Sequence, residues 1–216
     1  QLMGDRRPQD RSEVYAEQAM YLHKYAEEEV VLQVVRIGDL AMIAWPNEVY
    51  AITGLKLKHR SPLDMTFNLS LANGACGYIP PPEQHALGGY TTWPARTAGL
   101  EVQAEPKMVS AMLSLLERVS EKKRRQYRES ESPYSRQIQQ SNPEGYFRLG
   151  DLSGPYLNNT IDSKIQLRPQ GLVAYHLPGR EGPQFGSGQH TRAIQLAGGK
   201  LITEHMDVPD NYSIEF

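Results

Sequence analysis

The sequence has little of several residue types, and each shortage excludes a class of protein. Cys76 is the only cysteine among 216 residues, which excludes an internal disulfide framework. The 23 Lys and Arg residues nearly balance the 25 Asp and Glu residues, so the net charge of −2 creates no global field for nucleic acid or an anionic membrane. No run of about 18 apolar residues occurs, so no transmembrane segment is predicted.

Histidines are present, but not at the spacing of a metal site. The chain contains His23, His59, His85, His176, His190 and His205. No two of them form a pair such as H-x-x-x-H, which would place two imidazoles on one face of a helix. All six are therefore interpreted as solvated or packed side chains.

The N-terminal part of the chain predicts a helix followed by a β-hairpin. Asp10 can cap a helix that runs to about Glu27. The β-branched run 30–37 and the apolar run 40–45 flank Gly38-Asp39, which is typical of a two-residue hairpin turn. Both strands of this hairpin are expected to be buried.

Three more elements are expected after the hairpin. Pro46 ends the second strand, and Asn47 is expected to cap a helix that runs to about Lys58. A short strand is predicted at 67–71. A last helix is predicted from Pro106 to about residue 123, because proline favours a first helical turn and the apolar residues recur at helical spacing.

The composition changes twice along the rest of the chain. Residues 120–144 are polar and charged without apolar periodicity, which indicates a linker. Residues 145–216 are short apolar pieces punctuated by glycine and proline. The sequence therefore predicts a mixed α/β (α+β) domain at 1–119, a linker at 120–144 and a β-rich region at 145–216. Because the chain lacks an initial methionine and ends in a strand pattern, an internal fragment of a larger protein is expected.

Two polar residues stand where a catalytic site could be built. Glu48 follows Pro46-Asn47, where an apolar strand gives way to the predicted helix. Tyr78 follows a glycine-rich loop, 73–77, after the next strand. By residue type alone, Glu48 would lie in a first helical turn and interact with the helix dipole without any metal. Tyr78 would pack with its hydroxyl at the surface.

In this order, the two motifs resemble the end of the catalytic domain in the neutral/alkaline ceramidase family, zinc amidases that cleave N-acyl sphingosines. In that family, a proline-x-glutamate turn carries one zinc ligand. A tyrosine after the following strand carries another and lies beside the scissile amide. The resemblance implies that Glu48 and Tyr78 bind Zn²⁺, that Tyr78 is also catalytic, and that the substrate is a lipid amide. It also implies two zinc-binding histidines upstream, in sequence that this chain does not contain, and an exported or periplasmic location.

The segment 88–97 resembles the part of the family that closes over the active site. Its exposed Tyr90, Trp93 and Arg96 are expected to bind a polar head group or an acyl chain. The alternative is that Tyr90 and Trp93 simply cover the core. Glu48 and Tyr78 are expected to converge, because strand 67–71 should run alongside strand 40–45.

The stretch Tyr146-Phe147-Arg148-Leu149-Gly150-Asp151 resembles the opening strand of bacterial LamG-like, concanavalin A-type modules. Further strands are expected at 192–196, 198–202 and 212–216. The resemblance implies an incomplete all-β sandwich after the partial catalytic domain, with a glycan or cell-surface ligand.

Two functions follow from these resemblances. The first is a fragment of a bacterial zinc-dependent amide hydrolase, inactive by itself. The alternative is a non-catalytic carbohydrate or cell-surface binding protein with a degenerate ceramidase-like domain.

Overall fold

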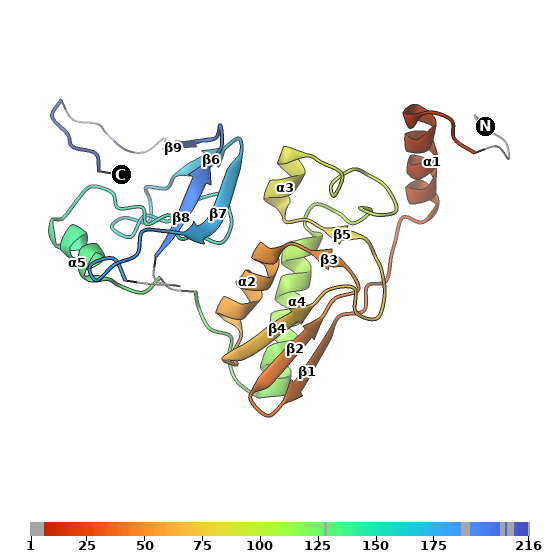
Figure 1. Ribbon diagram of the computed structural model, residues 1–216, viewed down its shortest axis with the longest axis horizontal. Helices are drawn as coiled ribbons and strands as arrows, with labels where there is room; N and C mark the ends of the chain where they lie inside the picture. The colour runs from red at the N-terminus through yellow and green to blue at the C-terminus, as the bar shows by residue number, and fades with distance from the viewer. Residues whose placement is uncertain (1–6, 128, 187–190, 204–205, 207–209, 216) are drawn as a thin grey trace. The chain divides into compact units, whose positions relative to one another are not determined.

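The computed structural model describes residues 7–127, 129–186, 191–203, 206 and 210–215. The chain divides into two compact units, Gln1–Tyr127 (unit 1) and Arg128–Phe216 (unit 2). The boundary falls within the segment 120–144 that the sequence predicts as a linker. The fold class is mixed α and β, as the sequence predicts, with small sheets in both units (Figure 1).

A three-stranded sheet of order β1-β2-β4 forms the framework of unit 1. β1 (Gln33–Ile37) and β2 (Leu40–Ala44) are antiparallel and meet at the predicted Gly38-Asp39 turn, where Gly38 has φ +59°. β4 (Met65–Leu69) pairs with β2 in parallel. The expected neighbour of the hairpin is therefore present, two residues earlier in sequence than 67–71.

Two helices cover one face of this sheet. α4 (Ala104–Ser120) lies behind the strands in Figure 1, and α2 (Ala51–Arg60) packs against both α4 and β4. Side chains at helical spacing on α4 belong to one core cluster with the inward side chains of β2, because strand residues alternate between faces. In the described part of unit 1, the largest fully buried apolar side chains are Ile43, Trp45, Leu57, Leu63, Ile79, Met112, Leu113 and Leu116.

A buried ion pair joins the two helices. The Glu105 carboxylate, 1% exposed, accepts hydrogen bonds from Thr53 Oγ1 at 2.8 Å and Lys56 Nζ at 3.0 Å. Removing one partner of such a pair leaves a buried charge uncompensated. The contact therefore fixes the start of α2, directly after the segment that carries Glu48.

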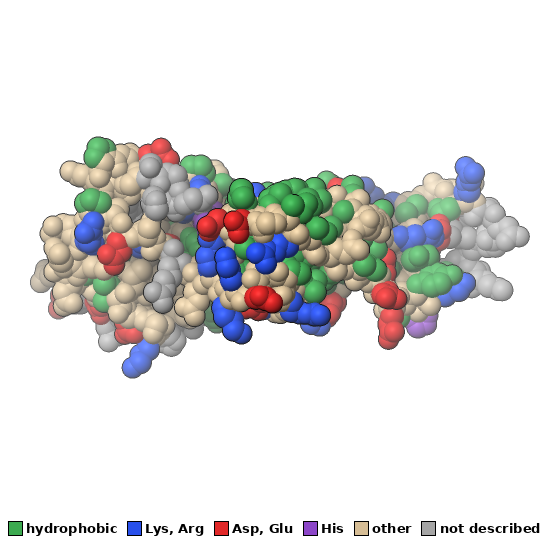
Figure 2. All heavy atoms as spheres, turned by 90° about the horizontal axis from the view of Figure 1, so that it is seen from below, with side chains coloured by type: hydrophobic (Ala, Val, Ile, Leu, Met, Phe, Trp, Pro, Cys, Tyr) green, Lys and Arg blue, Asp and Glu red, His purple; other side chains and the backbone are tan. Residues whose placement is uncertain are grey.

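The opposite face of the sheet, here called the outer face, is largely apolar, and no helix covers it among the described residues of unit 1. Four of the five residues of β1 are exposed, so the prediction of two buried strands is correct only for the inward side of β2. The reason is that β1 is an edge strand and the helices lie on one face only. Figure 2 shows hydrophobic side chains gathered over this part of unit 1. The large apolar side chains of the outer face are Val35, Ile37, Leu40, Met42, Met65, Phe67 and Leu69.

The first helix, α1 (Arg11–Lys24), begins as predicted. The Asp10 side chain accepts a hydrogen bond from the Glu13 amide, the expected N-cap. The helix ends three residues before Glu27, and none of its residues is buried.

The start of α2 differs from the prediction. Asn47 does not cap it; Tyr50 occupies the N-cap position, and residues 48 and 49 form a short strand, β3 (Glu48–Val49). β3 pairs in parallel with β5 (Tyr78–Ile79), and α3 (Pro82–Leu87) follows β5. Glu48 is therefore not in a helical first turn, and the interpretation of Glu48 as a residue at the helix dipole is wrong.

Unit 2 contains one helix and two small antiparallel sheets in its described residues. α5 (Pro133–Gln140) lies inside the predicted linker, because Ser132 and Ser135 form a capping box around Pro133. β6 (Arg168–Gln170) pairs with β9 (Lys200–Ile202), and β7 (Val173–Pro178) pairs with β8 (Arg192–Leu196). The strands expected at 192–196 and 198–202 are thus present, the second shortened at its start.

Two other expected strands of unit 2 are not formed. The opening stretch 146–151 makes only an isolated bridge, Phe147 to Asn159. Residues 212–215 have no strand structure, and residue 216 lies outside the described residues. In the described parts of the chain, no helix is long and apolar enough to cross a membrane.

Candidate functional site

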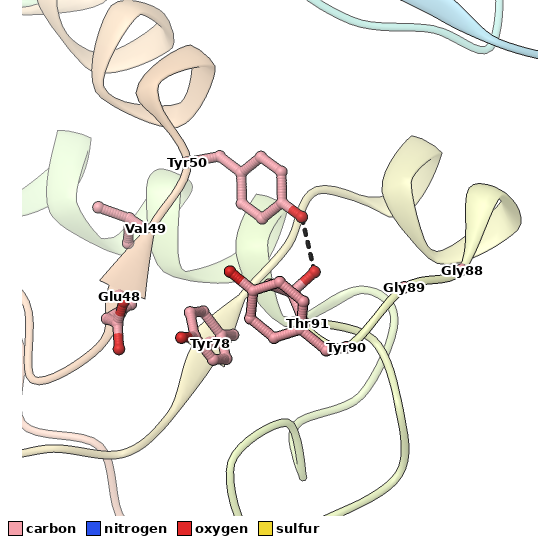
Figure 3. A pocket seen from close by; sticks show the side chains of 8 residues that line it. All are labelled: Glu48, Val49, Tyr50, Tyr78, Gly88, Gly89, Tyr90 and Thr91. Carbon is pink, nitrogen blue, oxygen red and sulfur yellow. Dashed lines mark hydrogen bonds between the residues drawn. The ribbon is translucent and has the colours of Figure 1, made fainter.

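The parallel pair β3 and β5 places Glu48 beside Tyr78. The two residues are register partners, and the Glu48 amide donates a hydrogen bond to the Gly77 carbonyl at 2.9 Å. Partners in adjacent strands project from the same side of a sheet. Figure 3 shows the Tyr78 hydroxyl turned toward Glu48. The structure therefore brings together two residues that are thirty positions apart in sequence.

Asn47 holds the glycine-rich loop against the end of β2. Its side chain is fully buried, and Nδ2 donates to the Cys76 carbonyl at 2.9 Å. Its carbonyl accepts from the Leu71 amide at 3.1 Å. The first of these bonds uses the side chain that the sequence assigns to a helix cap, and the second uses the Asn47 backbone carbonyl. Asn47 is therefore not available as a cap, and α2 begins at Ala51.

Gly77 is required by the backbone at the next position. It has φ +73°, and a Cβ there would overlap the Thr97 carbonyl group. The same Thr97 oxygen accepts a hydrogen bond from the Tyr78 amide at 2.7 Å. The close contact at Gly77 and the hydrogen bond of the Tyr78 amide together fix the backbone position of Tyr78.

A cavity of about 430 Å³ opens beside this pair. Its lining is Glu48, Val49, Tyr50, Tyr78, Gly88, Gly89, Tyr90 and Thr91. The Tyr50 hydroxyl and Thr91 Oγ1 are hydrogen bonded at 2.7 Å, and the rings of Tyr78 and Tyr90 meet edge to face with centroids 5.4 Å apart. The loop after α3 is thus held beside the cavity by Tyr50, the N-cap residue of α2, and by Tyr78 of β5.

The cavity carries one carboxylate and no balancing cation among the described residues that line it. Partial burial raises the pKa of Tyr78, and the negative charge of Glu48 and the neighbouring Tyr90 phenol raise it further. Tyr78 is therefore a neutral phenol at pH 7 in the protein alone. A cation bound between the two oxygens would reverse the effect of Glu48, since it would favour the phenolate.

The three residues predicted to bind substrate lie in two different places. Tyr90 lines the cavity, whereas Trp93 and Arg96 are outside its lining and face α1. Arg96 forms an ion pair with Glu17 at 2.7 Å and lies 4.3 Å above the Tyr21 ring.

Trp93 meets the Tyr15 ring edge to face at 6.1 Å. Together, Trp93 and Arg96 attach the N-terminal helix to the loop. Their assignment to substrate binding is therefore not supported by their positions.

Tyr50 and Thr91 are cavity residues that the sequence analysis missed. Tyr50 stands two residues after Glu48, and in a strand this spacing places two side chains on one face. The signal was hidden because the segment was predicted to be helical. Thr91 is recognisable only through its contact with Tyr50, since 41 residues separate the two.

The two oxygens suit a metal but do not complete a site. Zinc in a catalytic site takes three protein ligands and keeps an open position. Glu48 and Tyr78 supply two, and in the described residues no group of three or more His, Cys, Asp or Glu is placed to hold a metal ion. The residues present fit part of a zinc site.

No family model matches the chain, and no curated protein or solved structure gives a significant match. Function can therefore be inferred only from the geometry and chemistry of the site.

Proposed function

We propose that this chain contributes two ligands, Glu48 and Tyr78, to the zinc site of an amide hydrolase similar to the neutral ceramidases. The observation that carries the proposal is the register pair in β3 and β5 at the wall of a cavity. The remaining ligands, expected to be histidines, would come from outside this chain. Bound zinc would lower the pKa of its water to about 7 and polarise the amide carbonyl.

The side chains of the cavity have separate roles in this proposal. The Glu48 carboxylate and the Tyr78 oxygen hold the cation from a rigid backbone. The Tyr78 phenol stands next to the position of the amide carbonyl and orients it. Tyr90 packs on Tyr78 and limits the access of water, while the bond between Tyr50 and Thr91 keeps the loop closed over the substrate. Val49 and the tyrosine rings provide the apolar surface that an acyl chain requires.

The test is Glu48→Gln in the intact protein. A neutral amide is a poor zinc ligand, so we expect the zinc content to fall and kcat/KM for a short-chain ceramide to drop by at least about 100-fold. The fold should remain, because Glu48 caps no helix and its side chain is exposed. Zinc analysis, kinetics and circular dichroism measure the three quantities.

Glu27→Gln is the matched control, because Glu27 is an exposed glutamate outside the cavity lining. It should leave zinc content and rate unchanged. Full zinc content and full activity in the Glu48→Gln protein would remove Glu48 from the metal site. An intact parent protein without zinc or amidase activity would instead favour the non-catalytic binding protein.

A further inference from the structure

Unit 2 contains a larger cavity, of about 650 Å³. It lies between the start of α5, the stretch 145–149, the strands β8 and β9, and residues 213–215. Cavities of several hundred Å³ with apolar walls and a few polar groups are the usual form of small-molecule sites. All the residues named here belong to unit 2.

Much of the wall is apolar or aromatic. Its apolar and aromatic members include Tyr146, Phe147, Leu167, Phe185, Leu201 and Ile214. Such a wall favours a ligand with an apolar body, because each buried methylene of the ligand gains about 0.8 kcal/mol.

Three polar atoms of the same wall lack partners. In the described part of the chain, six buried side-chain atoms have no hydrogen-bond partner, and three of them are Thr191 Oγ1, Arg192 Nε and Thr203 Oγ1. All three residues line this cavity. Unpartnered buried polar atoms are rare, and several in one place indicate a missing group. Arg192 Nε can only donate, so the missing group must contain an acceptor.

The charges of the cavity leave two guanidinium groups for a ligand. Glu129 pairs with Arg148 at 2.9 Å, and Glu215 accepts a hydrogen bond from the Tyr134 hydroxyl at 2.5 Å. In the described residues, no carboxylate lies within ion-pair distance of Arg180 or Arg192. The Arg180 guanidinium instead lies 4.7 Å above the Phe185 ring.

We propose that this cavity binds a small organic anion, a carboxylate carried on an apolar body. The carboxylate would accept hydrogen bonds from Arg192 and from the hydroxyls of Thr191 and Thr203, with Arg180 at the rim. Guanidinium groups suit this geometry, because their planar N–H groups match the two oxygens of a carboxylate. The apolar body would lie against Phe147, Phe185 and the aliphatic wall.

The experiment measures binding of three probes with the same tail to the full chain by isothermal titration calorimetry. The probes are octanoate, octanamide and octylammonium. We expect octanoate to bind at least about tenfold more tightly than octanamide, because only the carboxylate forms charge-assisted hydrogen bonds. Octylammonium should bind most weakly, since two arginines repel it.

Arg192→Gln should remove the preference, lowering octanoate affinity to that of octanamide while octanamide binding stays the same. Arg180→Gln, at an exposed rim position, should weaken octanoate binding to a smaller extent than Arg192→Gln does. Because Arg180 is exposed, this variant still tests the proposal if Arg192→Gln fails to fold. Arg136→Gln is the matched control, an exposed arginine of α5 outside the cavity lining. It should change nothing.

Equal affinities for the three probes would overturn the proposal. So would octanoate binding that both Arg192→Gln and Arg180→Gln leave intact. A neutral disaccharide that binds where octanoate does not would assign the cavity to a glycan instead.

Discussion

The cavity beside Glu48 and the cavity of unit 2 are both lined by tyrosines, but they differ in charge. Among its described lining residues, the first has a carboxylate and no cation, whereas the second has three arginines and two glutamates. Within the described residues, no oppositely charged side chain pairs with Glu48 in the first cavity or with Arg180 and Arg192 in the second. The lining of the first cavity is thus net negative and that of the second net positive, as the two proposals require, although the whole chain is almost neutral.

The largest expected effect comes from a substitution that disrupts the first cavity and leaves the second intact. Gly77→Ala places a Cβ against the Thr97 backbone at φ +73°, so we expect unit 1 to lose about 3 kcal/mol of stability. Both tryptophans, Trp45 and Trp93, are in unit 1. Urea unfolding followed by tryptophan fluorescence therefore reports on unit 1 alone.

Gly38→Ala is the control for this change. Gly38 also has a positive φ, +59°, but no atom lies within 4 Å of its added Cβ. Gly38→Ala should lower the free energy of unfolding by only about 1 kcal/mol, because alanine is strained at positive φ but meets no neighbouring atom. Octanoate binding by unit 2 should survive in both variants. Equal destabilisation by the two substitutions would mean that the Thr97 contact does not position Tyr78.

The second expected effect is a pH dependence of the stability of unit 2. The hydrogen bond to Glu215 and partial burial raise the pKa of Tyr134 to about 12 from the ordinary 10.0. The folded state therefore keeps a proton that the unfolded state loses first. The contribution to stability is full below pH 10 and is lost as the pH rises toward 12.

Glu215→Gln should move the Tyr134 pKa back toward its ordinary value. The measurement is a pH titration of phenolate absorbance for the parent protein and for Glu215→Gln. In each case, the curve of the same protein carrying Tyr134→Phe is subtracted, so that the difference reports on Tyr134. An unchanged titration would show that Glu215 does not accept a hydrogen bond from the Tyr134 hydroxyl in solution.

The smallest effect concerns the loop that closes the first cavity. Arg96→Ala removes an exposed ion pair and a cation–π contact to α1, so we expect a loss of no more than about 1 kcal/mol. The amides of α1 should exchange hydrogen faster, while kcat/KM of the proposed amidase reaction stays within about twofold. Glu17→Gln should give the same exchange pattern. A tenfold rise in KM for Arg96→Ala alone would return Arg96 to substrate binding.

Local signals in the sequence predicted the parts of the fold that local interactions determine. Asp10 caps α1 through a residue three positions away, and Gly38-Asp39 turns the hairpin with its immediate neighbours. α4 was predictable because one helix face carries its apolar residues. α5 was missed although Ser132 and Pro133 are a helix-start signal, because the segment lacks apolar periodicity.

The features that were predicted wrongly depend on partners that are distant in sequence. Asn47 has the residue type of a helix cap, but carbonyls about thirty residues later take its amide. Arg96 binds Glu17 across 79 positions, which no local pattern encodes. The convergence of Glu48 and Tyr78 was predicted from a family resemblance and from the strand order, and the structure brings them together by a pairing, β3 with β5, that the sequence did not predict.

The pairing of Glu48 with Tyr78 also determines when the cavity can form during folding. The chain between them holds α2 and β4, so the pair closes only after a thirty-residue loop has ordered. The β1–β2 hairpin needs only its own turn, and hairpins form within about 1–10 μs. Contacts between distant residues form later, because the chain must first lose the entropy of the loop. The Glu48–Tyr78 pair therefore forms after the β1–β2 hairpin, and a molecule that needs both oxygens can bind only once unit 1 has folded this far.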